Sequence, residues 1–186
     1  MKISAGKFKG ISIEAPRGLL SRPPLAVIRE AIFNIIGRRI EGKSVLDLFA
    51  GSGSLGIEAL SRGASVVHFV DQSRRCVEMI KRNLNRLGVA SCCNVTRQDA
   101  FLFVREWRGP SFDIVFVDPP FLSGHVATTL DALQSSSILG EQTLVVARMH
   151  WREEFPVSTT YELLRRRKFG ESVVLFLTRA QDGGDS

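Results

Sequence analysis

The chain has 186 residues, a length expected of one compact domain that buries a hydrophobic core without disulfides or metals. Its hydrophobic fraction of 44% and charged fraction of 24% are ordinary for a soluble globular protein, and no apolar run reaches the length of a membrane span. Residues 1–7 lack the features of a secretory signal, and the three cysteines form no CxxC pair. We therefore expect a cytoplasmic monomer with no metal site.

Positive charge is concentrated at the N-terminus. Residues 1–40 hold eight Lys or Arg against two Glu, which accounts for the whole net charge of +6. A neutral body with a basic arm is typical of a domain that gained a contact surface for a polyanion, although a solvated charged surface is the alternative. The residues expected to touch nucleic-acid backbone are Lys2, Lys7, Lys9, Arg17 and Arg22.

The first 40 residues divide into a small appendage and a helix. Two apolar stretches, 3–5 and 8–13, flank Gly6 and Lys7 and predict a β-hairpin. A helix is expected from about Pro24 to Ile36, ended by Gly37, with a buried face of Val27, Ile28, Ala31, Ile32, Ile35 and Ile36. We divide the chain into a basic hairpin arm over 1–20, a main domain over 21–180 and a flexible tail over 181–186.

From residue 44 onward, short β-branched runs alternate with segments of helical length, which is typical of a parallel sheet built from βαβ units. We expect strands over 44–49, 65–70, 92–96, 112–117 and 143–148, and helices near 54–62, 74–87, 100–107 and 124–136. Residues 163–168 and 172–179 predict a hairpin, which gives the sheet an antiparallel C-terminal edge. The expected fold class is α/β and Rossmann-like, with helices on both faces.

A glycine-rich loop follows the first of these strands. Gly51, Gly53 and Gly56 have the GxGxxG spacing of a nucleotide-binding loop, which alone is a weak signal. The second strand leads to Asp71, whose carboxylate is placed to accept hydrogen bonds from both hydroxyls of a ribose. Together these features predict a site for a cofactor that contains adenosine.

Asp47 distinguishes between two such cofactors. It lies immediately before the glycine loop, where a carboxylate would repel the pyrophosphate of NAD. S-adenosylmethionine instead presents an ammonium and a sulfonium, so we favour it, with a loop-capping role for Asp47 as the alternative. Asp99 is expected beside the adenine or as the cap of the next helix. The predicted cofactor-binding residues are Asp47, Phe49, Gly51, Gly53, Gly56, Asp71, Asp99 and Ala100.

The fourth strand ends in the most specific motif of the chain, Asp118-Pro119-Pro120-Phe121. In an open parallel sheet these residues lie at the carboxyl end of the strand, beside the glycine loop. We expect the proline-flanked carbonyls to be free of local donors, so that Asp118 and a neighbouring carbonyl accept both hydrogens of an amine while a base stacks on Phe121. We therefore assign a catalytic role to the four residues in direct methyl transfer to an exocyclic amine.

Several blocks of sequence together resemble one family. They are residues 5–10, Arg22-Pro23, residues 29–35, residues 47–64 and residues 118–121. They are similar to the bacterial 16S ribosomal RNA guanine-N2 methyltransferases of the RsmD type. The resemblance implies a seven-stranded methyltransferase domain, S-adenosylmethionine as donor with S-adenosylhomocysteine as product, and a guanine N2 target in 16S ribosomal RNA. It also implies that the partner is the small ribosomal subunit or an assembly intermediate.

Three alternatives stay open at this point. A nicotinamide-dependent reductase is disfavoured by Asp47, an amino-methyltransferase acting on another RNA or DNA base shares the Asp-Pro-Pro-Phe motif, and a non-catalytic RNA-binding assembly factor could keep the same fold. Of the histidines, we expect His68 in a strand and His150 in a loop. His125 is the one expected to approach the pocket, although we rank it first as the start of a helix.

Overall fold

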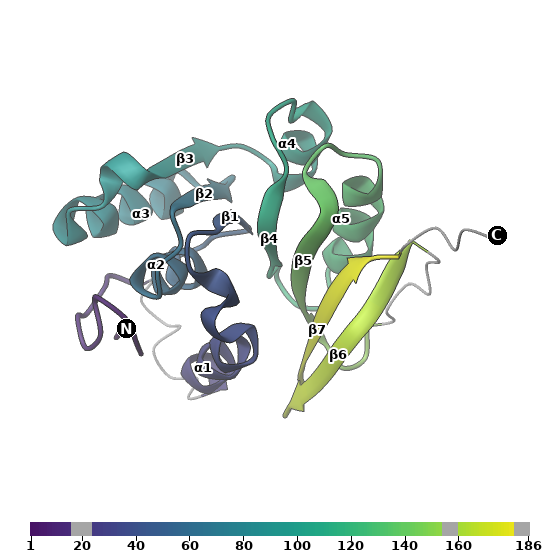
Figure 1. Cartoon of the computed structure of the whole chain (residues 1–186), viewed down its shortest axis with the longest axis horizontal. Helices are drawn as coiled ribbons and strands as arrows, with labels where there is room; N and C mark the ends of the chain where they lie inside the picture. The colour runs from purple at the N-terminus through teal and green to yellow at the C-terminus, as the bar shows by residue number, and fades with distance from the viewer. Residues whose placement is uncertain (16–23, 154–159, 181–186) are drawn as a thin grey trace.

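A seven-stranded sheet in the order β3-β2-β1-β4-β5-β7-β6 organises the molecule (Figure 1). Strands β1 to β5 are parallel, β7 runs antiparallel to β5, and β6 pairs with β7 at the edge. The computed structural model describes residues 1–15, 24–153 and 160–180. Its elements are α1 (Pro24–Ile36), η1 (Gly37–Ile40), β1 (Ser44–Leu48), α2 (Ser54–Ser61), β2 (Val66–Asp71), α3 (Arg74–Leu87), η2 (Ala90–Cys92), β3 (Cys93–Arg97), α4 (Ala100–Glu106), β4 (Phe112–Val117), α5 (His125–Gln134), β5 (Leu139–His150), β6 (Tyr161–Phe169) and β7 (Ser172–Arg179).

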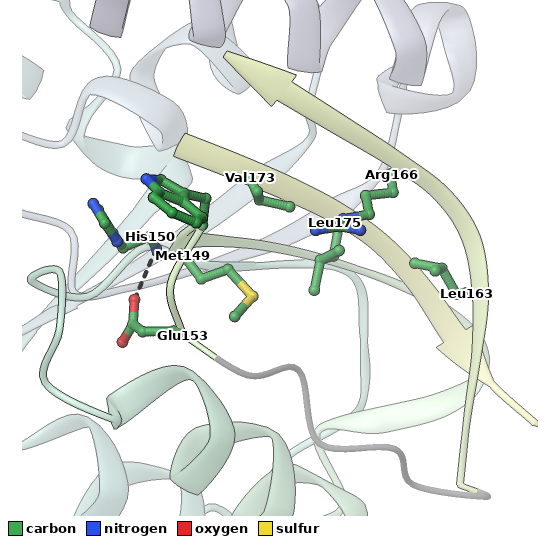
Figure 2. Close-up of a pocket in the computed structure, with 8 residues that line it drawn as sticks. Met149, His150, Glu153, Leu163, Arg166, Val173 and Leu175 are labelled. Atoms are coloured by element: carbon green, nitrogen blue, oxygen red, sulfur yellow. Dashed lines mark hydrogen bonds between the residues drawn. The ribbon is translucent and has the colours of Figure 1, made fainter. Parts of the chain in front are cut away.

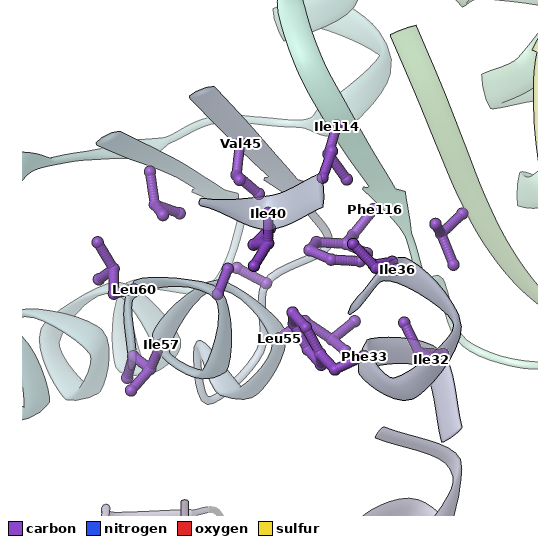
Figure 3. Packing of buried hydrophobic residues seen from close by; sticks show 14 of the residues in the cluster. Ile32, Phe33, Ile36, Ile40, Val45, Leu55, Ile57, Leu60, Ile114 and Phe116 are labelled. Carbon is purple, nitrogen blue, oxygen red and sulfur yellow. The ribbon is translucent and has the colours of Figure 1, made fainter. Parts of the chain in front are cut away.

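Helices cover both faces of the sheet, as expected. One buried cluster joins α1, α2 and α3 to their face, with Phe33 of α1 packed against Phe116 of β4 at a ring-centroid distance of 5.7 Å (Figure 3). The other cluster joins α4 and α5 to the opposite face. Because β1 and β4 are buried on both sides, they are nearly continuous apolar runs instead of alternating ones. The predicted Rossmann-like class with an antiparallel C-terminal edge is confirmed.

Local signals account for most element bounds. Helix α3 begins after Ser73, whose side chain accepts a hydrogen bond from the Cys76 amide, and ends at Gly88 in the left-handed conformation. The fifth strand is longer than predicted, since pairing with β4 and β7 extends it to Leu139–His150. Helix α1 ends at Ile36, before Gly37 at φ +59°, as predicted, and the 3-10 turn η1 follows. One expectation for α1 is wrong, because Val27 is 56% exposed.

The N-terminal segment forms a short hairpin, as predicted. Its two arms meet in an antiparallel bridge between Lys2 and Ser12, and backbone hydrogen bonds run from the Ile3 amide to the Ile11 carbonyl and from the Ile13 amide to the Met1 carbonyl. The amides of Ser4 and Ala5 bind the Glu58 carboxylate instead of an opposite strand. Gly6, at φ +80°, lies so close to the Ser61 carbonyl that a Cβ atom would overlap it. Contacts with α2 therefore hold residues 4–7 of the hairpin.

Glu58 is the centre of these contacts and is only 1% exposed. Its carboxylate accepts hydrogen bonds from the Ser4 hydroxyl at 2.6 Å and from Arg62 Nε at 2.9 Å, and forms an ion pair with Arg29 Nε at 3.3 Å. Burial alone would raise the pKa of Glu58, but the hydrogen bonds from Ser4 and Arg62 and the charge of Arg29 lower it. One charged carboxylate thus joins the N-terminal segment, α1 and α2.

Replacing Glu58 by Gln should destabilise the fold by about 3 kcal/mol, because Arg29 is 5% exposed and would keep a buried charge without its carboxylate. The measurement is the free energy of unfolding in urea, followed by circular dichroism. Glu78→Gln is the matched control, since Glu78 is an exposed carboxylate paired with Arg74 on α3 and its loss should change little. Equal stability of the two variants would contradict the role given to Glu58.

Candidate functional site

The predicted site residues follow three neighbouring parallel strands at the same edge of the sheet. In the register, Leu48 of β1 lies opposite Val70 of β2 on one side and Val117 of β4 on the other. The residues that come next in each strand direction, Phe49, Asp71 and Asp118, therefore lie side by side. The connection from β1 goes to β2 on one side, and the chain later crosses to β4 on the other side. This switch point is where open parallel sheets bind ligands.

The glycine loop between β1 and α2 uses left-handed backbone three times. Gly51 at φ +58° and Gly53 at φ +77° adopt it at little cost, whereas Phe49 at φ +62° is a strained position. Gly56 has ordinary helical backbone but lies against β2, where a Cβ atom would come within 2.2 Å of the Phe69 ring. The glycines thus serve the turn and the close packing of α2 on the sheet.

Two carboxylates bind the amides of this loop. Asp71 accepts a hydrogen bond from the Gly51 amide at 2.8 Å, and Asp47 accepts one from the Gly56 amide at 2.9 Å. In a pyrophosphate-binding loop such amides would face the phosphate groups. Here they are satisfied by aspartates, so the loop offers negative charge instead of anion-binding donors. The loop-capping alternative for Asp47 is therefore observed, and it also disfavours a dinucleotide.

Asp47 is buried in a negative environment. It is 1% exposed, and burial raises the pKa of its carboxyl to about 7, against the lowering effect of the Gly56 amide. The charges of Asp118 and Asp71 raise this pKa further, which shows that the three carboxylates are near enough to interact. A ligand that carries positive charge would relieve this repulsion.

The adenine side of the predicted site begins with Asp99, which caps α4. Its carboxylate accepts hydrogen bonds from the Phe101 and Leu102 amides at 3.0 Å each, and the following Ala100 is buried. The capping alternative for Asp99 is therefore observed, and a contact with adenine stays a prediction. Beside it, the rings of Phe49, Phe101 and His125 contact one another, and the centroids of the stacked His125 and Phe49 rings are 6.1 Å apart. His125 is the first residue of α5, which was the first of the two roles expected for it.

Arg148, for which no sequence pattern predicted a role, binds both ends of the Asp-Pro-Pro-Phe motif. Its Nε donates to Asp118 Oδ1 at 2.6 Å, and its Cζ lies 4.6 Å from the centroid of the Phe121 ring. The pairing of Val117 with Ala147 explains the contact, because it sets the next residues, Asp118 and Arg148, side by side. Burial raises the pKa of Asp118, and the charge and hydrogen bond of Arg148 oppose the rise. The guanidinium thus lies on the Phe121 ring and binds Asp118, the two groups that were predicted to bind a target base.

The two prolines of this motif differ in their surroundings. Pro119 is buried, whereas Pro120 is exposed and its carbonyl accepts a hydrogen bond from the Ser123 hydroxyl at 2.6 Å. The expectation that the carbonyls here are free of local donors is therefore wrong for Pro120, because the chain turns back immediately after Phe121. The carbonyl of Pro119 is the remaining candidate for a second acceptor.

Of the other two histidines, His68 is placed as expected and His150 is not. His68 lies in β2 as predicted, buried, with its ring bonded to the Thr96 hydroxyl at 2.8 Å, and burial lowers its pKa to about 4. His150 was expected in a loop but ends β5, where its ring centroid is 5.6 Å from that of Phe121. The expectation that only His125 approaches the pocket is wrong, since the position of His150 depends on how far β5 extends.

The basic arm is exposed where the structure describes it. Lys2, Lys7 and Lys9 all lie at the surface. Arg17 and Arg22, the other residues predicted to bind RNA, fall outside the described residues, as does the tail 181–186. The described residues contain no cluster of His, Cys, Asp or Glu suited to a metal ion. In the same parts of the chain, no helix has the length and apolar character needed to cross a membrane.

Comparison with known proteins places the chain in a family. The sequence profile described as conserved hypothetical protein 95 matches residues 1–178. The chain is 36% identical to the "Putative rRNA methyltransferase YlbH" of Bacillus subtilis, covering 90% of this chain and 92% of that protein. It is 30% identical to the "Ribosomal RNA small subunit methyltransferase D" of Escherichia coli K12, covering 100% and 93%.

A solved structure agrees with these sequence matches. The "Putative methyltransferase yhhF from Escherichia coli" superposes with a TM-score of 0.85 at 30% identity, covering 97% of this chain and 99% of that one. The resemblance to RsmD-type enzymes inferred from the motifs is thereby confirmed over nearly the full length. Because both the profile and these relatives span almost the whole chain, it belongs to the conserved hypothetical protein 95 family.

Proposed function

We propose that this protein transfers a methyl group from S-adenosylmethionine to the exocyclic N2 amine of a guanine in small-subunit ribosomal RNA. The observation that carries the proposal is the convergence of Asp47, Asp71 and Asp118 at the ends of adjacent strands, with the Phe121 ring beside them. The relatives named as ribosomal RNA methyltransferases support the reaction class. The guanine target and an assembled or partly assembled subunit as substrate are our inference.

The chain's own residues fit this cofactor. The buried Asp47, its pKa raised by burial and by two neighbouring carboxylates, favours a cation in its vicinity. Asp71 holds the loop through the Gly51 amide and retains lone pairs to accept from a ribose, since each carboxylate oxygen accepts more than one hydrogen bond. When bound, S-adenosylmethionine supplies an activated methyl on a sulfonium. The Gly51 and Gly56 amides already bind aspartates, so they are not free to bind a pyrophosphate.

Asp118 and the carbonyl of Pro119 are the groups that would hold the target amine. An exocyclic nitrogen is a weak nucleophile because its lone pair is delocalised into the ring. Two acceptors that bind its hydrogens favour a pyramidal nitrogen, and preorganised acceptors stabilise the positive charge that develops during transfer. Phe121 would fix the plane of the base, and Asp118 would take the proton afterwards.

The present partner of Asp118 supports guanine over other bases. Guanine carries its amine at C2 next to N1–H, so its edge is itself a guanidine unit with parallel donors. Arg148 places a planar guanidinium against the Phe121 ring and donates from it to Asp118. A site that accepts this group suits the same donor pattern in a base, whereas the amines of adenine and cytosine lie next to a ring acceptor. Arg148 has to leave when the base enters.

The proposal is tested by methylation of small ribosomal subunits and of naked small-subunit RNA, followed by mass spectrometry of the nucleosides. We expect N2-methylguanosine as the product. Asp118→Ala should lower the rate roughly 100- to 1,000-fold, as for loss of one preorganised polar group, with nearly unchanged affinity for S-adenosylhomocysteine. Full turnover by this variant would contradict the assignment of Asp118. A folded protein that binds RNA but never transfers methyl would favour the assembly-factor alternative.

The raised pKa of Asp47 predicts pH-dependent cofactor binding. The ionised carboxylate binds the ammonium of S-adenosylhomocysteine better than the protonated form does, so the affinity for this ligand should rise about tenfold from pH 6 to pH 8, with proton release on binding. The affinity rises with pH because the Asp47 carboxyl is largely protonated below its folded pKa of about 7 and ionised above it. Calorimetry in buffers of different ionisation enthalpy measures both effects, and Asp47→Asn should abolish the pH dependence. Tight binding of NAD would overturn the cofactor assignment.

The basic arm is proposed to grip RNA backbone and not the cofactor. Lys7 and Lys9 are exposed on a segment held to α2, and each phosphate contact adds about 0.7 to 0.9 to the slope of log affinity against log salt. Replacing both lysines by Ala should reduce that slope by roughly 1.5 if both touch phosphate. RNA affinity at several salt concentrations measures the slope, with cofactor affinity as the internal control. An unchanged slope would show that this charge is merely solvated.

A further inference from the structure

A second basic surface lies at the opposite end of the chain, on the edge strand β6. Residues 162–168 of β6 are all exposed, and four of them in succession are cationic: Arg165, Arg166, Arg167 and Lys168. Within the described ranges, none of these four forms an ion pair with a carboxylate, whereas exposed arginines elsewhere, such as Arg74 and Arg82, do. The positive charge of β6 is therefore available to an external anion.

Trp151 lies beside this strand, at the end of β5. Its side chain is 45% exposed, which is unusual for the largest apolar residue. Lys168 Nζ and Arg152 Cζ each lie 5.1 Å from the centroid of a Trp151 ring. An exposed indole with cations on it is the combination that proteins use to bind single-stranded nucleic acid, in which bases stack on rings and phosphates bind the cations.

The surface next to Trp151 is hollowed by a pocket of about 240 Å³ (Figure 2). Its apolar lining comes from Met149 and from Leu163, Val173 and Leu175 of the C-terminal hairpin, and Arg166 also lines it. Glu153 is a further lining residue, and its carboxylate accepts hydrogen bonds from the His150 amide at 2.7 Å and the Gly124 amide at 3.4 Å. The pocket thus combines an apolar lining with one arginine and with a carboxylate bound to backbone amides.

His150 connects this pocket to the methyl-acceptor site. Its ring centroid lies 5.6 Å from that of Phe121 and 6.0 Å from that of Trp151. The His150 ring therefore lies between Trp151 and Phe121, the ring on which the target base is proposed to stack. That spacing suits a neighbouring nucleotide of the same strand when the target base is turned out of its stack.

We propose that Trp151, Arg166 and Lys168 form a subsite for a nucleotide that flanks the target base in single-stranded RNA. The flanking base stacks on Trp151 at the mouth of the pocket, and its phosphates bind Arg166 and Lys168. The inference rests on the proposed RNA methylation, and it adds a contact surface on the side of the site away from the N-terminal arm. RNA is favoured over a protein partner because Arg152 and Lys168 lie over the Trp151 ring, Arg166 lines the adjoining pocket, and the apolar lining is small.

The chain allows a direct test, since Trp107 and Trp151 are its two tryptophans. In a Trp107→Phe variant, Trp151 is the only indole and its fluorescence reports on that position alone. We expect saturable quenching when a guanine-containing single-stranded oligoribonucleotide of roughly eight nucleotides is added, a length within known single-strand site sizes. In a Trp151→Phe variant, the remaining Trp107 should show no quenching. Absence of quenching in the first variant would overturn the proposal.

Affinity measurements separate stacking from charge. Trp151→Ala should weaken binding of the oligoribonucleotide about tenfold to a hundredfold, the range measured for loss of one stacking ring. Arg166→Ala with Lys168→Ala should reduce the salt slope by about 1.4, as expected for two phosphates of a single strand. Arg75→Ala with Arg105→Ala is the matched control, because both arginines are exposed on helices α3 and α4, and it should leave the slope unchanged. An equal effect of the two double variants would count against the subsite.

The outcome also separates this inference from the proposed function. Methylation of small-subunit RNA at full rate and affinity by Trp151→Ala would refute the subsite and leave the function standing. Quenching of Trp151 by the oligoribonucleotide without any methyl transfer by the wild-type protein would support the subsite and refute the function. Quenching by ribosomal proteins but not by RNA would refute the nucleotide subsite.

Discussion

The buried carboxylate of Glu58 fixes the position of α2, and the arrangement of the site depends on that helix. Its oxygens bind the N-terminal segment through Ser4, helix α1 through Arg29, and Arg62 at the end of α2 itself. In the first turn of α2, which follows the glycine loop, the Gly56 amide binds Asp47 of β1. The two carboxylates, Asp47 and Glu58, therefore hold the helix in place, and a shift of α2 would move the loop relative to β1. The N-terminal segment is thus part of the support for the site.

Charge balance divides the site into two halves. On the cofactor side, Asp47 and Asp71 face backbone amides, and their negative charge has no cationic side chain among the contacts described above. On the acceptor side, Asp118 is neutralised by Arg148. Binding of a sulfonium would supply the missing positive charge on the first side, whereas a neutral base on the second side has to replace a cation. Entry of the base therefore costs an ion pair, and the released guanidinium becomes available to the RNA backbone.

The sequence predicts those features that depend on near neighbours in the chain. Apolar periodicity and capping residues such as Ser73 and Gly88 give the helices, and β-branched runs give the parallel strands. The contact of Arg148 with Asp118 follows from the register of β5 against β4, for which the sequence carries no local signal. The contact of the N-terminal hairpin with α2 was missed for a similar reason, because the amides of Ser4 and Ala5 bind a carboxylate more than 50 residues away. Long-range pairing is thus what sequence reasoning missed.

The basic strand β6 has one more consequence. It pairs with β7 alone, so the hydrogen-bonding groups on its other side meet no further strand within the described residues. An open edge of nine residues is a template on which a second copy could continue the sheet, and aggregation can start this way. Four consecutive cations oppose it, because two such strands laid together would repel each other. High ionic strength screens this repulsion, so the condition that releases RNA would also remove the protection against edge-to-edge association.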